Sequence, residues 1–300
     1  MYTCSDTMLN AKTQFGAVGD GVTDDSEHLQ KAIDAAVVCG GKALFLPVGT
    51  YVLSRTLRVS GHMMLLGEGA SGSCHGLDTN VSAGNMRGTV LLQTNSSADG
   101  IYVSVGSHCE SVQLRDFSLV ARPVHSTGAA VRVVGLENNM CDGKIERLLI
   151  ENWETGVHCL ACQNAALNDL KIRRPWGRGV IIEGDPHISW DQDAAGDSRI
   201  IGLDYFGCQR DGAGGGTDGC HSHAAIEYRN GGAWFISQGK YLLGDYGLLL
   251  NQTRGPTGTL LITGNSFEEQ IISSVAFILS KPENLTCESR VLAGKPCVAG

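Results

Sequence analysis

The sequence contains few aromatic residues, few positive charges and no long apolar run. Phe, Trp and Tyr make up 6% of its 300 residues, which predicts a narrow core filled by Val, Ile and Leu. The formal net charge of −8 argues against a nucleic-acid partner, because phosphates need a basic surface. No apolar stretch reaches the roughly 18–20 residues of a membrane-spanning helix, so no membrane insertion is expected. The first residues also lack the charged-then-apolar pattern of a signal peptide, so the chain either is not exported by that route or has lost a signal before this numbering begins.

Cysteine, by contrast, is abundant: the chain has 11, an odd number that leaves at least one thiol unpaired within a monomer. The cysteines expected to pack as small apolar residues are Cys39, Cys109 and Cys159. The pairs that could form disulfides are Cys208 with Cys220 and Cys287 with Cys297. Cys159 and Cys162 have CxxC spacing without a second CxxC, so packing at a strand end explains them better than a zinc site. Free thiols are favoured over a disulfide framework, although four N-glycosylation sequons slightly favour secretion.

Glycine is abundant as well, with 40 residues and no collagen period, which indicates many turns. A glycine-rich run at residues 16–21 precedes a predicted helix that begins at Asp24, where Asp24 and Glu27 fit a capping box. The apolar stripe of this helix consists of Leu29, Ile33, Ala36 and Val37. Gly40 and Gly41 end the helix, and a β run at residues 43–46 follows.

Residues 15–52 (FGAVGDGVTDDSEHLQKAIDAAVVCGGKALFLPVGTYV) resemble the N-terminal motif of the pectate-lyase-like superfamily of right-handed parallel β-helices, and are most similar to phage tailspike and tail-fibre depolymerases. The resemblance implies an all-β solenoid with an N-terminal capping α-helix, which covers the apolar end and the unpaired strand edges of the first coil. We therefore interpret Asp24 and Asp25 as cap residues rather than as paired catalytic carboxylates. The expected organisation is an arm at 1–14, the motif and cap helix at 15–42, the β-helix at 43–279 and a closing or subunit-contact segment at 280–300.

A repeat of short β runs supports this fold. Matching positions lie 26, 23, 46, 22 and 28 residues apart, at Val131, Val157, Val180, Ile226, Leu248 and Ala276. A period near 23 with two or three short strands predicts a parallel β-helix. The 46-residue step is interpreted as two coils, one of which has its second strand replaced by a loop. An all-β sandwich would explain neither the period nor the cap helix.

Three insertions break the period, at residues 136–144, 185–198 and 207–223, and such insertions often build the binding site of a solenoid. In the second insertion Trp190 can stack against a sugar ring. The polar residues there that are expected to bind sugar hydroxyls are His187, Asp191 and Asp193. In the third insertion His221 and His223 could bind a metal with a nearby Asp, but a solvated loop is the preferred interpretation.

Acids at outward positions of neighbouring coils are candidates for hydrolysis of a glycosidic bond. Hydrolysis needs two carboxylates about 5–9.5 Å apart, and stacked strands lie about 4.8 Å apart with every second side chain pointing outward. Glu183 and Glu227 both follow an apolar residue that is expected to face inward, and Asp204 is placed on the intervening coil. These three acids are the predicted catalytic residues. Their alternative interpretation is solvated acids at strand ends.

A lyase motif gives a second possibility. The segment RRPWGR at residues 173–178 resembles the R-x-P-x-x-R segment of pectate lyases. That resemblance implies Arg173 as base and Arg178 as a clamp for a uronate carboxylate. Trp176, between them, is a further predicted substrate contact. Ca²⁺ would be needed under this alternative, and no cofactor is expected otherwise. The calcium-binding carboxylates of that family are not matched, and a basic turn is the preferred interpretation.

The resemblance to tailspikes implies a receptor-binding protein of the virion tail that recognises and depolymerises host surface polysaccharide. It also implies a homotrimer that assembles with other tail or baseplate proteins and acts outside the host cell. One alternative is a secreted, monomeric polysaccharide lyase, hydrolase or epimerase. The other is a non-catalytic structural or adhesive spike, since no complete catalytic signature is present.

Overall fold

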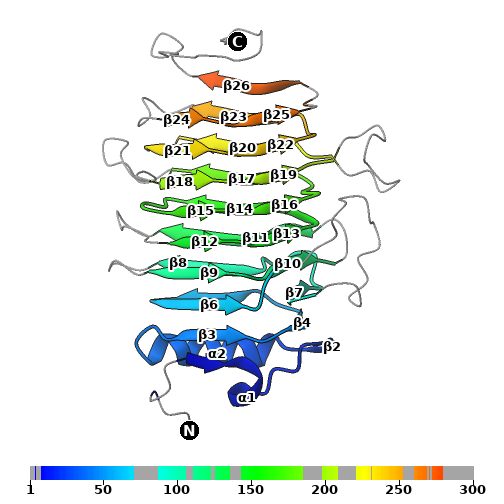
Figure 1. Ribbon diagram of the computed structural model, residues 1–300, viewed down its shortest axis with the longest axis vertical. Helices are drawn as coiled ribbons and strands as arrows, with labels where there is room; N and C mark the ends of the chain where they lie inside the picture. The colour runs from blue at the N-terminus through cyan, green and yellow to red at the C-terminus, as the bar shows by residue number, and fades with distance from the viewer. Residues whose placement is uncertain are drawn as a thin grey trace.

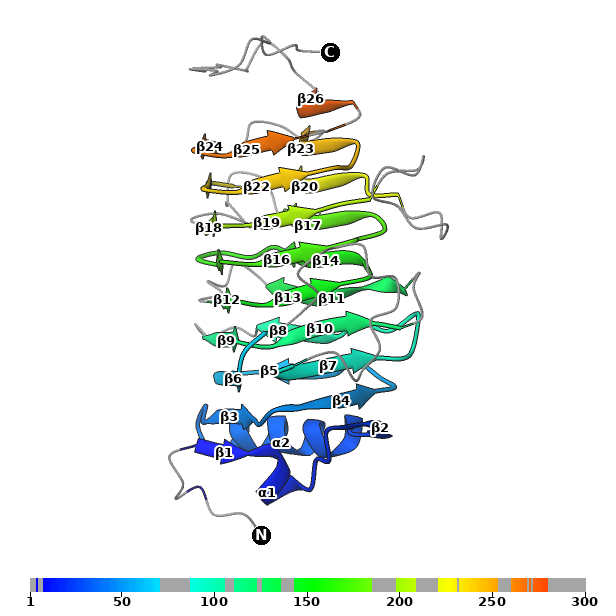
Figure 2. The same ribbon diagram turned by 45° about the vertical axis from the view of Figure 1, so that its right-hand side comes forward.

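The computed structural model describes residues 4, 8–70, 87–105, 111–122, 126–135, 143–184, 198–208, 221–230, 232–252, 260–268, 270 and 272–279. Along these residues the chain coils as a stack of short strands (Figure 1, Figure 2). The strands align into three parallel sheets, which we call A, B and C and which contain nine, nine and eight strands. Each coil contributes one strand to each sheet in that order, except that the first coil has a helix in place of a sheet C strand. The predicted all-β, right-handed parallel β-helix is confirmed.

The strands are short and regularly placed. Sheet A consists of β1 (Met8–Asn10), β3 (Ala43–Leu46), β6 (Met63–Gly67), β9 (Val112–Arg115), β12 (Lys144–Glu146), β15 (Ala166–Asn168), β18 (Ser198–Ile201), β21 (Trp234–Ser237) and β24 (Leu260–Thr263). Sheet B consists of β2 (Asp20–Asp24), β4 (Gly49–Leu53), β7 (Thr89–Gln93), β10 (Ser118–Ala121), β13 (Leu149–Glu151), β16 (Lys171–Arg173), β19 (Asp204–Phe206), β22 (Lys240–Leu242) and β25 (Ser266–Glu268). Sheet C consists of β5 (Leu57–Ser60), β8 (Ile101–Val105), β11 (Ser126–Gly135), β14 (Trp153–Leu160), β17 (Arg178–Glu183), β20 (Ala224–Arg229), β23 (Tyr246–Gln252) and β26 (Ser273–Leu279).

The register between coils corrects one prediction about the repeat. The inward row of sheet C consists of Val131, Val157, Val180, Ile226 and Leu248. Val180 pairs directly with Ile226, so the 46-residue step is a single coil enlarged by two insertions, not two coils. Leu248 pairs with Val275, so the last predicted position, Ala276, is one residue out of register.

The corner between sheets A and B is a tight turn built on one left-handed residue. In four consecutive coils this residue has φ between 51° and 70°, at Asp116, Arg147, Asp169 and Gly202. The residue that follows points into the core and is at most 1% exposed, at Phe117, Leu148, Leu170 and Leu203. The same geometry therefore repeats and stacks apolar side chains at one corner.

Aromatic side chains are few, but the core uses them. Those that are fully buried include Tyr51, Phe117, Trp153, Tyr205, Tyr228 and Tyr241. Tyr205 faces Gly179, where an added Cβ would lie 2.7 Å from the ring, so glycine is required there by space. The core is thus not made of Val, Ile and Leu alone: it also contains aromatic side chains, for which a small neighbouring residue such as Gly179 leaves space.

Helix α2 (Ser26–Val38) covers the N-terminal end of the solenoid (Figure 1). It begins two residues later than predicted, and Asp24 accepts from the Ser26 backbone N–H at 3.0 Å. Glu27 pairs with Lys31 at 2.6 Å. Asp25 is buried and accepts from the backbone N–H groups of residues 18 and 19 at 2.6 and 2.9 Å. Both aspartates therefore hold backbone beside the cap helix, as expected of cap residues. The predicted capping box of Asp24 and Glu27 is wrong, because the N-cap residue is Asp25 and its side chain makes no capping hydrogen bond.

The N-terminal arm holds more structure than expected. Strand β1 and helix α1 (Ala11–Phe15) both lie in the segment that was predicted as an arm, and β1 starts sheet A by pairing with β3. Asn10 caps α1 by accepting from two backbone N–H groups at 3.0 and 3.1 Å. Among the described residues no helix is long and apolar enough to cross a membrane. The closing segment predicted at 280–300 lies outside the described residues.

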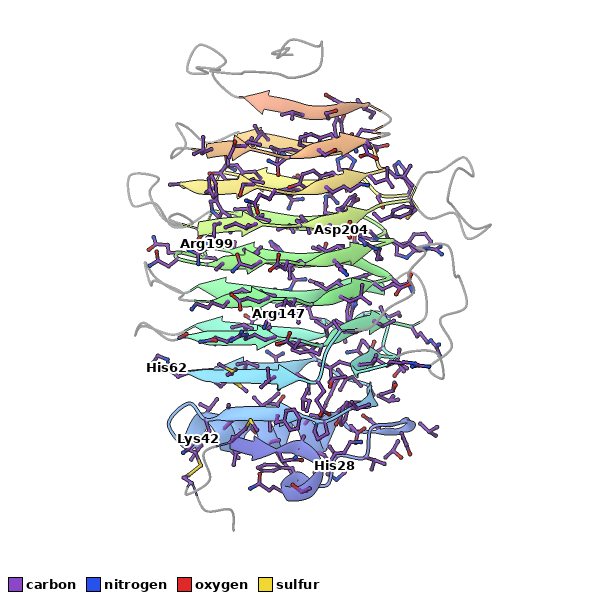
Figure 3. All side chains as sticks on the ribbon, in the orientation of Figure 1. His28, Lys42, His62, Arg147, Arg199 and Asp204 are labelled. Carbon is purple, nitrogen blue, oxygen red and sulfur yellow. A yellow bond between two sulfur atoms is a disulfide. The ribbon has the colours of Figure 1, made fainter. Side chains whose placement is uncertain are left out.

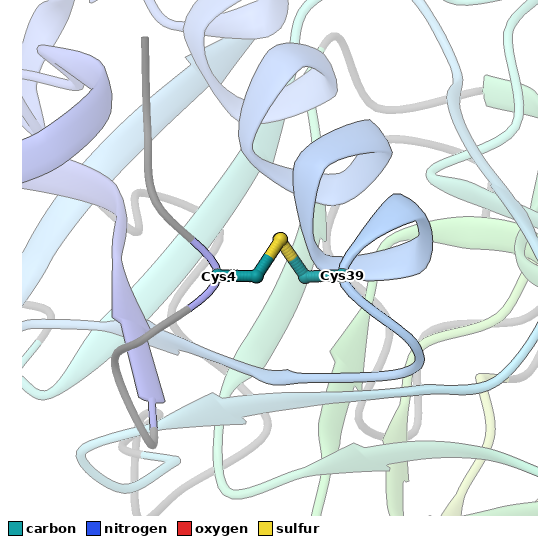
Figure 4. The surroundings of a disulfide bond; sticks show 2 residues. All are labelled: Cys4 and Cys39. Atoms are coloured by element: carbon teal, nitrogen blue, oxygen red, sulfur yellow. A yellow bond between two sulfur atoms is a disulfide. The ribbon is translucent and has the colours of Figure 1, made fainter.

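The cysteines correct a further prediction. Cys39 is not a lone apolar residue, because it forms a disulfide with Cys4 that ties the arm to the end of α2 (Figure 4). Cys208 is also disulfide-bonded. Cys159 and Cys162 are both buried, as expected for packing at a strand end. The other cysteines named above lie outside the described residues, at Cys109, Cys220, Cys287 and Cys297.

Candidate functional site

The outer face of sheet C carries two rows of side chains that run from coil to coil. The central row consists of Arg58, Tyr102, Arg132, His158, Ile181, Glu227 and Leu249. The second row consists of Ser60, Ser104, Val134, Leu160, Glu183, Arg229 and Asn251. Strand alternation places these residues opposite the core, and neighbouring members of a row lie about 4.8 Å apart along the solenoid.

Glu227 joins two arginines on this face. Its Oε2 accepts from Arg178 Nε at 2.6 Å, and its two oxygens accept from Arg229 Nε and Nη2 at 2.8 and 3.0 Å. Burial opposes ionisation of the carboxyl, but the hydrogen bonds from Arg229 and Arg178 outweigh it and hold the pKa of Glu227 below its ordinary value. Glu227 is therefore an ionised acceptor that fixes both guanidinium groups.

A second group, centred on His158, continues the network toward the N-terminal coils. Arg132 Nη1 lies 2.6 Å from His158 Nδ1, and since a guanidinium can only donate, Nδ1 accepts. His158 Nε2 then donates to Glu183 Oε2 at 3.0 Å. Burial first, and then the charge of Arg132, lowers the pKa of His158, so the ring is neutral near pH 7. Both ring nitrogens are occupied.

The two groups are linked into one line of contacts. Arg229 Nη1 approaches Glu183 Oε2 at 3.4 Å, which joins the Glu227 group to the His158 group. At the other end Arg132 binds Asp99 through Nε and Nη2 at 2.7 and 3.0 Å. Charges therefore alternate along this line from Asp99 to Arg178, and each charged side chain in it is held by its neighbours.

A histidine–aspartate cluster lies at the edge of sheet C, beside Arg178. Asp245 Oδ2 lies 3.4 Å from His223 Nδ1, and Oδ1 lies 2.9 Å from His221 Nε2. The His223 ring meets the Tyr246 ring edge-on, with centroids 5.3 Å apart. The backbone N–H of His223 donates to Gly177, the residue before Arg178, at 2.6 Å. The Asp245 side chain is 12% exposed, whereas the His223 side chain is 35% exposed.

This geometry suits proton transfer. A carboxylate that accepts from Nδ1–H orients an imidazole and leaves Nε2 for a substrate. Nε2 of His223 makes no hydrogen bond to any residue that the structure describes. Among the described residues there is no group of three His, Cys, Asp or Glu side chains arranged to hold a metal ion, and residues 209–220 of the third insertion lie outside them.

The predicted catalytic acids are placed on two different sheets. Glu183 and Glu227 share the outer face of sheet C but occupy different rows, and Arg229 lies between them. Asp204 belongs to sheet B (Figure 3). Its carboxylate accepts from Arg173 Nη2 at 2.5 Å. The placement of Asp204 beside the other two acids is therefore corrected: the left-handed turn at Gly202 moves the chain from sheet A to sheet B before Asp204.

The predicted lyase motif is divided as well. Arg173 ends β16 in sheet B and Arg178 begins β17 in sheet C, so the two arginines face different sides of the solenoid. Trp176 lies half-buried in the turn between them. The remaining predicted sugar contacts lie outside the described residues, at His187, Trp190, Asp191 and Asp193.

Two residues that the structure brings to this face were not predicted from the sequence. His158 could have been predicted as an outward residue from the alternation of side chains along a strand, because it lies between the inward-facing Val157 and Cys159. Asp245 had no such signal, because its partners lie 22 and 24 residues earlier in the chain and meet it only when coils stack.

The fold places the chain in the class of right-handed parallel β-helix proteins. Within this class a family profile described as "Rhamnogalacturonase A/epimerase, pectate lyase-like" matches residues 8–174, more than half of the chain. The chain belongs to this family.

Curated relatives match only short parts of the chain. A mannuronan C5-epimerase of Azotobacter vinelandii, AlgE5, is 46% identical over 67 residues, which is 22% of this chain and 6% of the relative. Alginate lyase 7 of the same organism is 55% identical over 40 residues, 13% of this chain and 5% of the relative. Plasmin and fibronectin-binding protein A of Streptococcus pneumoniae is 43% identical over 61 residues, 20% of this chain and 8% of the relative. The chain thus spans less than a tenth of each relative.

Among solved structures, the Agl-KA catalytic domain is similar over 89% of this chain and 47% of its own length, with a TM-score of 0.53 and 15% identity. This similarity concerns the fold.

Proposed function

We propose that the protein modifies an acidic polysaccharide on the outer face of sheet C, by removing the proton next to a sugar carboxylate. The observation that carries the proposal is the position of the His223–Asp245 pair beside Arg178. Arg178 pairs across the sheet with Ala224, the residue after His223. Ala224 pairs in turn with Tyr246, the residue after Asp245. A base, its orienting carboxylate and a guanidinium thus come from three neighbouring coils.

The chemistry has defined requirements. The base takes the proton from the ring carbon that carries the carboxylate, and the electron pair moves into the carboxylate, where a cation stabilises the added negative charge. In a lyase the pair then forms a carbon–carbon double bond while the glycosidic carbon–oxygen bond breaks, and an acid protonates the departing oxygen. In an epimerase a proton returns to the opposite face of the same carbon.

The residues of the face fit these roles. Arg178 donates to Glu227 through Nε, and its Nη1 and Nη2 make no hydrogen bond to a described residue, so they are available for a carboxylate. His223 offers Nε2 as the base, with Nδ1 directed to Asp245. Tyr246, whose ring contacts that of His223, is the proposed acid. The names of the epimerase and lyase relatives agree with this reaction class.

Hydrolysis by Glu183 and Glu227 is less well supported. A hydrolase needs one carboxyl that stays protonated, and so has a raised pKa, to donate to the leaving oxygen. The two arginines on Glu227 lower the pKa of its carboxyl instead. We therefore assign Glu227 to positioning Arg178 and Arg229.

Calcium has no part in this proposal. The resemblance to pectate lyases implies that Ca²⁺ is needed, and Ca²⁺ is usually bound by several carboxylate and carbonyl oxygens. On the outer face of sheet C the carboxylates of Glu183 and Glu227 are instead bound by arginine and histidine side chains. In our proposal guanidinium groups supply the positive charge.

We further propose a secreted enzyme rather than a virion protein. The disulfide between Cys4 and Cys39, together with the disulfide-bonded state of Cys208, supports this, because disulfides persist in oxidising compartments. The tailspike-like trimer and the adhesive spike remain the alternatives. A solution mass of three chains would favour the former, and intact binding without any product would favour the latter.

The test is incubation with mannuronan, polygalacturonate and a neutral glucan. We expect a product from an acidic polymer only, detected as ultraviolet absorbance of an unsaturated uronate or as a changed C5 configuration by NMR. His223→Gln should abolish it, while the control His62→Gln, at a corner several coils away, should not. New reducing ends from the neutral glucan without unsaturation would contradict the proposal.

A further inference from the structure

The N-terminal part of the central row contains an arginine, Arg58, whose contacts differ from those of the other arginine in the row. Arg58 on β5 is exposed, and no carboxylate among the described residues pairs with its guanidinium. By contrast, Arg132, two coils further along, is held by Asp99 and His158. Within the described part of the chain, Arg58 therefore has no counter-charge, whereas Arg132 has one.

Arg58 is nevertheless well positioned. Its guanidinium carbon lies 5.2 Å from the centroid of the Tyr102 ring, in cation–π contact. Its backbone is fixed on both sides by Gln30 of the cap helix, which accepts from the Arg58 N–H and donates to its carbonyl, each at 2.8 Å. The ring and the helix restrict a side chain that would otherwise lose more entropy on binding.

The number of coils between Arg58 and the proposed catalytic residues gives the distance between the two sites. Five strand spacings separate Arg58 on β5 from β20, the strand that follows His223, which amounts to about 24 Å at about 4.8 Å per strand. An extended polysaccharide that lies along the solenoid would cross one strand with roughly each sugar. A chain with a carboxylate at the active site would therefore reach Arg58 about five sugars away.

We propose that Arg58 and Tyr102 form a distal subsite for the carboxylate of an acidic sugar in the same polysaccharide. This rests on the proposed function for the identity of the substrate, but the subsite is a binding site and requires no reaction. The Arg58 guanidinium offers a carboxylate two parallel N–H groups, and Tyr102 holds the guanidinium in place. The consequence is a preference for long chains: oligosaccharides that span both sites bind more tightly than those that reach only one.

The experiment compares oligomannuronates of two lengths, a disaccharide and an octasaccharide, by calorimetric titration of the whole chain. Arg58→Gln is expected to weaken octasaccharide binding about tenfold and to leave disaccharide binding unchanged. Tyr102→Leu should give a smaller loss of the same kind. The matched control is Arg55→Gln, since Arg55 is also exposed but lies in the turn before β5, outside the central row.

The outcomes separate this proposal from the catalytic one. Equal octasaccharide affinity for wild type and Arg58→Gln would overturn the distal subsite, whatever the activity. Length-dependent binding that needs Arg58, without any product, would leave the subsite standing and remove the catalytic proposal. An equal loss with Arg55→Gln would show general electrostatic attraction and also overturn the subsite.

Discussion

The acids of the cap and the acids of sheet C have different partners. Asp24 and Asp25 accept mainly from backbone N–H and serine hydroxyl groups near the cap helix. Glu183 and Glu227 accept from arginine and histidine side chains that come from other coils. Acids that bind the backbone hold a segment in place, whereas acids that bind side chains position groups that can act on a ligand. Changes in the cap should therefore reduce stability, and changes on sheet C should reduce activity.

The largest expected effect is on catalysis. His223→Gln removes the proposed base and should lower kcat by about 10²–10⁴-fold, because general base catalysis contributes that much. Its free energy of unfolding should stay close to that of the wild type, since the side chain is partly exposed. Steady-state rates and urea denaturation measure the two quantities. A large loss of stability with unchanged turnover would assign His223 to the fold.

The cap should show the opposite behaviour. Asp25→Ala removes a buried carboxylate and leaves the part-buried N–H groups of Val18 and Gly19 without their acceptor, which should lower the free energy of unfolding by about 2–4 kcal/mol. The rate per folded molecule should not change. Asp25→Asn keeps one acceptor oxygen and should lose about half as much. Denaturant midpoints give the comparison, and equal stability of all three proteins would contradict the assigned role.

Glu227→Gln should moderately reduce both the activity and the stability of the protein. Without the charge, Arg178 and Arg229 are less well fixed, so kcat/KM should fall about tenfold, mainly through KM. The lowered pKa of Glu227 also gives a pH signature. Because the pKa of Glu227 is lower in the folded state than in the unfolded state, where it is near 4.5, the ionised carboxylate stabilises the fold at pH values above 4.5. This stabilisation is lost as the pH falls through the folded-state pKa. Glu227→Gln should lack this part of acid destabilisation, and identical acid denaturation curves would count against the ion pairs.

The smallest effect is expected for His158→Gln. Because the pKa of His158 is lowered from 6.5, the folded state binds this proton less readily than the unfolded state. The wild type should therefore lose stability as pH falls below about 6.5, and the variant should lose less over the same range. Thermal melts at pH 7.5 and pH 5.5 provide the measurement. A raised pKa, seen as greater wild-type stability at the lower pH, would contradict the Arg132 contact.

The local pattern predicts strands and caps well, because both depend on nearby residues. The period and alternation place Glu183 and Glu227 on the outside, and the glycine-rich motif indicates the cap helix. Asp204 was misplaced because the turn at Gly202 looks like part of one β run, although its positive φ divides two sheets. The single coil from Val180 to Ile226 was counted as two because insertions add a length close to one period.

The site depends on contacts that no local pattern encodes. Asp245 meets His221 and His223 only because successive coils stack in register. Likewise the disulfide between Cys4 and Cys39 requires the arm to run beside the end of α2. Arg178 was recognised, but its partner Glu227 lies 49 residues further along. Such pairs follow from the register, and one insertion of unknown length is enough to hide them.

The central claim is proton removal next to a sugar carboxylate, and reaction in deuterated water tests it most directly. After incubation with mannuronan, NMR of the product should show either deuterium at C5 or a double bond between C4 and C5, and neither should form with His223→Gln. New reducing ends on a product that has neither deuterium at C5 nor a double bond would show hydrolysis and contradict the account.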